Sequence, residues 1–65
     1  MENIMKLNDN EDLGVEFNSL DKRWWVIKYV KIGNLTKIVP IGNYGYKTKY
    51  IAVDVKNRLL KKMYA

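Results

Sequence analysis

The feature that most constrains this chain is the run RWWVIKYVKIGN at residues 23–34, where apolar side chains occur at both odd and even positions. Successive side chains of a β-strand point to opposite faces of the sheet, so a strand with one solvated face alternates apolar and polar residues. In this run Trp24 and Val26 have one parity, and Trp25 and Ile27 have the other. A chain of 65 residues is too short to cover both faces of a sheet completely. We therefore expect one face to build the core and the other to meet a partner.

The neighbouring segments predict further strands joined by tight turns. Gly33-Asn34 between two apolar runs is a two-residue hairpin signal, with Gly33 supplying the positive φ at the first turn position. Pro40 lacks an N–H group, which predicts an unpaired edge or a bulge at that residue. The other expected elements are a strand at 13–17, a return strand at 35–41, a turn at 42–45 that sets Tyr46 opposite Ile41, and a fourth strand at 46–53.

The end of the chain predicts a helix over residues 54–64. Asp54 is of the type that caps helix N-termini, and Val55, Leu59 and Met63 recur every four residues among lysines. The fold class expected is mainly β with a short C-terminal helix (α+β), in the order β-β-β-β-α, as a small antiparallel sheet or an SH3-like, partly open barrel. This plan resembles that of the small archaeal chromatin proteins with an SH3-like barrel, a likeness of architecture that assigns no site residue.

Charge divides the chain into two parts. Residues 1–21 carry six carboxylates and one lysine, a net of −5, and residues 22–65 carry eleven Lys or Arg against Asp54, a net of +10. We expect residues 1–12 to be an acidic flexible segment and residues 13–65 to be a single β-rich domain. Such asymmetry indicates a nucleic-acid or other acidic partner, although net charge also serves solubility.

The second face of the predicted sheet combines aromatic and cationic side chains. Cations attract phosphates, and aromatic rings stack on bases. The alternatives are that the N-terminal strand covers this face, or that a register slip of one residue exchanges the two faces. The candidate nucleic-acid-binding residues are Arg23, Trp25, Tyr29, Lys31, Lys47 and Lys49.

Composition argues against catalysis and metal binding. The chain has no Cys, no His and one Ser, and these residue types supply most nucleophiles, general bases and zinc ligands. We expect a protein that is not an enzyme and that needs no metal and no cofactor. The sequence has neither a signal peptide nor a membrane-spanning run, so an intracellular, cytoplasmic location is expected.

Two functions fit these observations. The first is a small non-catalytic nucleic-acid-binding protein of low sequence specificity, because lysines act as point charges rather than as base-reading forks. DNA is favoured over RNA as its partner. The second is a protein-binding inhibitor or adaptor, of the kind made by phages or plasmids, that docks on an acidic host or partner surface through the same patch. A homodimer is a further possibility, through the edge near Pro40.

Overall fold

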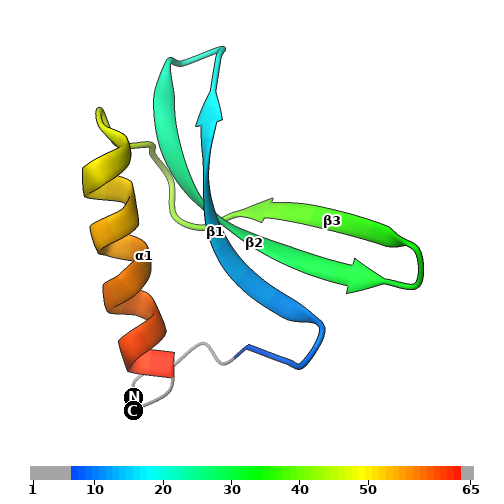
Figure 1. Cartoon of the computed structure of the whole chain (residues 1–65). Helices are drawn as coiled ribbons and strands as arrows, with labels where there is room; N and C mark the ends of the chain where they lie inside the picture. The colour runs from blue at the N-terminus through cyan, green and yellow to red at the C-terminus, as the bar shows by residue number, and fades with distance from the viewer. Residues whose placement is uncertain (1–6, 64–65) are drawn as a thin grey trace.

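The computed structural model describes residues 7–63, which form three antiparallel strands followed by one helix (Figure 1). The strands are β1 (Glu11–Asn18), β2 (Arg23–Ile32) and β3 (Leu35–Pro40), and the helix is α1 (Lys49–Met63). The central strand of the open sheet is β2, in the order β1-β2-β3. A mainly β chain with an antiparallel sheet and a C-terminal helix is therefore confirmed.

The β2–β3 hairpin has the register that its turn predicts. Ile32 lies opposite Leu35, and Tyr29 lies opposite Ile38. Gly33 adopts a φ of 62°, the positive value that a two-residue hairpin turn needs at its first position. The alternation of side chains along β2 and β3 is thus the predicted one.

Strand β1 is longer than the predicted strand at 13–17. It begins at Glu11, and Glu11 and Asp12 pair with Val30 and Tyr29 of β2. These two carboxylates belong to the sheet, so the predicted flexible segment at 1–12 is too long at its C-terminal end. Its first six residues lie outside the described part of the chain.

The predicted fourth strand at 46–53 is wrong. Tyr46 makes a single bridge, to Trp24 rather than to the predicted Ile41, and the helix begins at Lys49. Thr48 starts the helix early, because its hydroxyl accepts a hydrogen bond from the N–H of Ile51 at 3.2 Å. Without that strand the sheet stays open, and the SH3-like barrel is not formed within residues 7–63.

Asp54 is therefore an interior residue of α1 and not its N-cap. Its carboxylate lies 3.1 Å from the Arg58 guanidinium in an exposed pair one helical turn apart. The predicted apolar stripe is nevertheless present: Met63 is buried, and Val55 and Leu59 are half-buried. The last residue of the predicted helix, 64, lies outside the described residues.

The helix start leads to a matched pair of stability predictions. Replacing Thr48 with Ala should lower the free energy of unfolding by about 1 kcal/mol, since it removes the N-cap. The Asp54→Ala substitution should change it by less than about 0.5 kcal/mol, because exposed ion pairs contribute little. Urea denaturation followed by circular dichroism measures both, and a larger loss for Asp54→Ala than for Thr48→Ala would contradict this account of where α1 begins.

The helix packs on one face of the sheet, against β1 and β2, and does not reach β3 within the described residues. Leu13, Val26, Ala52 and Met63 are buried between these elements. Ala52 is fully buried, and its small side chain lets the helix backbone come close to the sheet. This face is the predicted core face, with Val26 turned inward.

The other face of the sheet is open, and the β2–β3 hairpin projects away from α1 (Figure 1). One residue of this face, Ile27, is only 3% exposed, so the expectation that it lies on the surface is wrong. Ile27 is central in β2, between Gly14 of β1 and Pro40 of β3. Two large residues of the same parity, Trp25 and Tyr29, flank it along the strand, which explains its burial.

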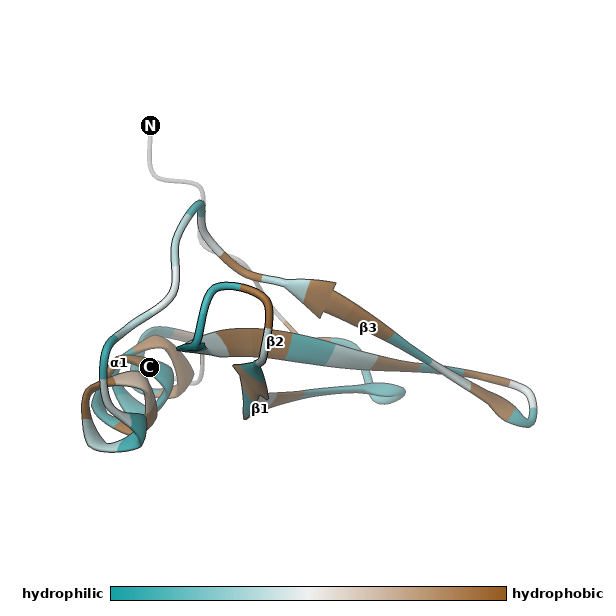
Figure 2. Ribbon diagram, turned by 90° about the horizontal axis from the view of Figure 1, so that it is seen from above, coloured by the Kyte–Doolittle hydropathy of each residue, from teal (hydrophilic) through white to brown (hydrophobic). Residues whose placement is uncertain are grey.

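The connection from β3 to α1 first follows the edge of β2. The Ile41 N–H donates to the Val26 carbonyl at 2.9 Å, and Tyr46 exchanges two backbone hydrogen bonds with Trp24, of 2.7 and 2.8 Å. Residues 42–45 between these contacts loop out of the sheet. Viewed from above, the connection arches over the sheet on its way down to α1 (Figure 2). It brings residues 46–49 beside the start of β2.

Candidate nucleic-acid interface

The six predicted site residues do not form one surface. Arg23, Trp25, Tyr29 and Lys31 share the open face of β2, whereas Lys47 precedes α1 and Lys49 is its first residue. Lys47 and Lys49 are therefore not on a strand of this face, as the prediction of a fourth strand had placed them.

On the open face, the polar group of each of the two aromatic side chains donates a hydrogen bond to a carboxylate. The Trp25 indole N–H donates to Asp21 Oδ2 at 2.8 Å, and the Tyr29 hydroxyl donates to Glu16 Oε2 at 2.9 Å. The bond to Glu16 raises the pKa of Tyr29, since ionisation would remove the donor and set two negative charges side by side. Phosphates are disfavoured beside these carboxylates.

The two rings are also held by backbone on the sheet. A Cβ added to Gly14 would collide with Tyr29 Cε2, so the tyrosine ring rests on the bare backbone of β1. A Cβ added to Gly45 would lie 2.6 Å from Trp25 Nε1, so the connection to α1 packs at the indole edge. Both rings are half-buried and serve to pack the open face.

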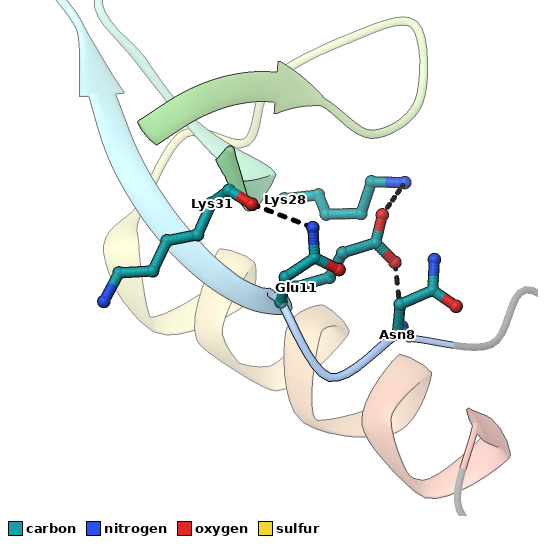
Figure 3. A network of polar contacts seen from close by, with 5 residues as sticks. Asn8, Glu11, Lys28 and Lys31 are labelled. Carbon is teal, nitrogen blue, oxygen red and sulfur yellow. Dashed lines mark hydrogen bonds and ion pairs between the residues drawn. The ribbon is translucent and has the colours of Figure 1, made fainter. Parts of the chain in front are cut away.

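Lys31 lies near the far end of β2 in a polar network (Figure 3). Its carbonyl accepts a hydrogen bond from Asn10 Nδ2 at 2.9 Å, while its ammonium points away from the network (Figure 3). Beneath it, Glu11 accepts a hydrogen bond from the Asn8 N–H and pairs with Lys28 at 3.4 Å. These two interactions hold the pKa of Glu11 below its ordinary value. Lys31 is therefore an isolated exposed cation, with acidic residues close by.

The second group of cations gathers around Trp24, on the helix side of the sheet. Lys49 Nζ lies 5.6 Å from the centroid of the Trp24 ring, within the range of a cation–π contact. The Phe17 ring packs against the same indole, with 5.2 Å between the ring centroids and 59° between the ring planes. Tyr46 is fixed to Trp24 through the backbone, which sets Lys47 at this point as well.

Arg23 adjoins this group from the other side of β2. A Cβ added to Gly45 would lie 2.7 Å from Arg23 Cβ, so the strand and the connection are in direct contact here. We call the surface formed by Arg23, Trp24, Tyr46, Lys47 and Lys49 the basic corner. Three of the six predicted site residues belong to it, namely Arg23, Lys47 and Lys49. Its two aromatic residues, Trp24 and Tyr46, have the alternation of the predicted core face and were not predicted as site residues.

The positive charge of the basic corner coincides with the positive end of a helix. The first turn of α1 contains no acidic residue, although carboxylates are the residues that stabilise this end of a helix dipole. Lys47 and Lys49 add to the positive potential there instead. The corner is thus suited to hold an anion, because Lys47 and Lys49 are exposed residues at the N-terminus of a helix.

The sequence contained a signal for the basic corner that the strand prediction overlooked. Thr48 is a good N-cap residue, and Ala52, Lys56, Leu59 and Met63 follow at helical spacing. An earlier helix start would have moved Lys47 and Lys49 off the open face. The partnership of Tyr46 with Trp24 had no such signal, because it depends on the looped-out residues 42–45.

Comparison of the chain with protein-family models, with curated proteins and with solved structures finds no match. Among residues 7–63, no three His, Cys, Asp or Glu residues are grouped so that they hold a metal ion. Over the same residues, α1 lacks the length and the apolar run that a membrane crossing needs.

Proposed function

We propose that this protein is a small non-catalytic nucleic-acid-binding protein of low sequence specificity, which holds backbone phosphates at the basic corner. The observation that carries the proposal is that Lys47 and Lys49 lie at the start of α1, whose first turn has no carboxylate, while Arg23 contacts the connection that leads to it at Gly45. Cations that cluster at a positive helix end favour an anion with several charges. A nucleic-acid backbone supplies such charges at regular spacing.

Duplex DNA is the form of nucleic acid that the basic corner fits best. Lysines recognise phosphates as point charges, without the bidentate geometry that reads bases. The Trp24 ring is already in contact with Lys49 and Phe17, and Trp25 and Tyr29 are held by carboxylates. Stacking on bases is the main contact of proteins with single-stranded nucleic acid. Few aromatic rings on the described β-strands are free to make it.

The test compares two double variants with the same change in charge. Lys47→Gln/Lys49→Gln should weaken binding of a random DNA duplex by about tenfold at low salt and reduce the salt-dependence slope by roughly 1–2. Lys61→Gln/Lys62→Gln, at the other end of α1, should have a much smaller effect. Fluorescence anisotropy at several salt concentrations measures both.

Equal losses in both double variants would show non-specific attraction to net charge and contradict the basic corner as the site. Absence of binding to either duplex or single strands at low salt would remove the nucleic-acid function altogether. A preference for single strands would contradict the choice of duplex DNA.

A protein-binding role, as an inhibitor or adaptor, is the second candidate, and a specific observation favours it. Ile32, Leu35 and Ile38 of the projecting β2–β3 hairpin are exposed, and such apolar surface is frequent at protein interfaces. An affinity pull-down after nuclease treatment separates the two functions. A partner that is retained after nuclease treatment favours the protein-binding role, and one lost with the nucleic acid favours DNA binding.

A further inference from the structure

A hollow of about 430 Å³ lies on the open face of the sheet. Ile27, Trp25, Ile38 and Pro40 give it an apolar lining, and Leu20 of the β1–β2 turn also lines it. Leu20 is 94% exposed and Ile38 is 49% exposed. The chain therefore leaves an apolar depression uncovered beside the β3 edge of the sheet.

The outer edge of β3 borders this hollow, and its backbone groups pair with no other strand within residues 7–63. Ile32 and Leu35 flank the two-residue turn, so they form a hydrogen-bonded pair. Such pairs recur at every second residue, so the backbone N–H and C=O groups of Lys37 and Val39 also point toward β2. The Ile41 N–H, which donates to Val26, continues the same series. Thr36 and Ile38 consequently present their N–H and C=O groups outward. Pro40 falls in the outward series, where its missing N–H removes no bond to β2.

The charge of the hollow is opposite to that of the chain. Glu16 is the only charged residue among the described residues that line it, whereas the whole chain carries a net charge of +5. The hydrogen bond from the Tyr29 hydroxyl holds one Glu16 oxygen in place, and Glu16 is an exposed residue, so its other oxygen can meet a ligand. Such a hollow fits a side chain with an apolar stem and a cationic end.

We propose that an extended segment of a partner protein adds to the outer edge of β3 as a fourth strand and places a Lys or Arg side chain in this hollow. Backbone bonds to Thr36 and Ile38 supply the pairing, as in other cases of strand addition. The stem of the cationic side chain packs on Ile27 and Ile38, and its head reaches Glu16. This site goes beyond the DNA-binding function and is independent of it.

A second copy of this chain fits the same edge less well. Antiparallel pairing of two β3 strands about Ile38 would set Thr36 beside the Pro40 of the other copy, and Pro40 has no N–H to donate. The residues that the second copy would place on the open face are its own Thr36, Ile38 and Pro40. None of these is a cation that could pair with Glu16. Pairing about Lys37 would oppose two lysines directly, which is destabilising. The charge of the hollow therefore favours a basic segment of another protein.

The test uses two synthetic peptides of about seven residues, a typical strand length. One is acetyl-Thr-Val-Thr-Arg-Thr-Val-Thr-amide, and the other has Glu in place of Arg. Titration into the full chain is followed by amide proton–nitrogen NMR spectra. The Arg peptide should shift the Thr36 and Ile38 amides and the Trp25 indole, and should bind at least about tenfold more tightly than the Glu peptide.

Two variants with the same charge change refine the result. Glu16→Gln should reduce the preference for the Arg peptide to about twofold or less, whereas Asp54→Asn should leave it unchanged, because Asp54 is on the outer face of α1. Ile38→Asp, at an exposed position, should abolish the shifts at Thr36. Unchanged spectra in the wild-type protein, or equal affinity for the two peptides, would overturn the proposal.

The outcome is separable from that of the DNA-binding function. A duplex should shift the amides of Lys47 and Lys49 and leave Thr36 and Ile38 in place, whichever way the peptide titration turns out. Shifts of Thr36 and Ile38 that grow with protein concentration in the absence of peptide would identify a second copy as the occupant and overturn the assignment to a partner protein.

Discussion

Ile27→Ala should lower the free energy of unfolding by about 2–5 kcal/mol, the usual range for removing a buried Ile side chain down to Cβ. Ile27 is 3% exposed in the centre of β2, where it is paired with Gly14 of β1 and Pro40 of β3. A chain of this length has roughly 3–10 kcal/mol of stability, at about 0.05–0.15 kcal/mol per residue. The variant should therefore be partly unfolded at room temperature.

Ile38→Ala is the matched control for this substitution. It removes the same atoms from the same face of the sheet, but Ile38 is 49% exposed and lies on the edge strand. We expect a loss of about 1 kcal/mol or less, in proportion to the smaller apolar area that it buries. Urea denaturation followed by tryptophan fluorescence measures both variants. Equal losses would mean that Ile27 is not part of the core.

The second large effect is expected for Gly45→Ala, in the connection between β3 and α1. An added Cβ would lie 2.6 Å from Trp25 Nε1 and 2.7 Å from Arg23 Cβ, both closer than van der Waals contact. Arg23 Cβ is bonded to the backbone and cannot swing away, so the connection must move outward. We expect a loss of about 1–3 kcal/mol, as for other overpacked sites.

Displacement of Gly45 should also alter the basic corner. Tyr46 follows directly and holds two backbone bonds to Trp24, and these bonds position Lys47 and Lys49. Gly45→Ala should therefore weaken duplex binding even where the protein remains folded. Asn43→Ala, at an exposed position in the same connection, is the control and should change neither property. Thermal unfolding and anisotropy test the pair, and a Gly45→Ala protein as stable as wild type would contradict the close packing.

Local patterns were sufficient to predict most of the sheet. The two-residue turn at Gly33-Asn34 determines the register of β2 and β3, because the turn type and the alternation of side chains agree. Pro40 marked the edge strand for the simple reason that it has no N–H. The apolar stripe of Val55, Leu59 and Met63 predicted the C-terminal helix and its packing.

The candidate site was harder to predict, because it depends on contacts between distant segments. Residues 46–53 alternate in a way that favours a strand, yet the Thr48 cap and the packing of Ala52 on the sheet favour a helix, and the helix prevails. That one difference moves Lys47 and Lys49 from the open face to the basic corner. The bond between Glu16 and Tyr29 depends on the register of β1 against β2, and the bond between Asp21 and Trp25 depends on the conformation of the β1–β2 turn.

Strands β1 to β3, the hairpin turn, the unpaired edge at Pro40 and a basic C-terminal helix can be predicted from the chain alone, because each follows from the geometry of a few adjacent residues. Which cations lie together, and which aromatic side chains are already bonded, depends on how the elements pack in three dimensions. The connection 41–48 leaves β3 along the edge of β2, and Tyr46 therefore meets Trp24. No local periodicity encodes a contact between residues so far apart in the chain.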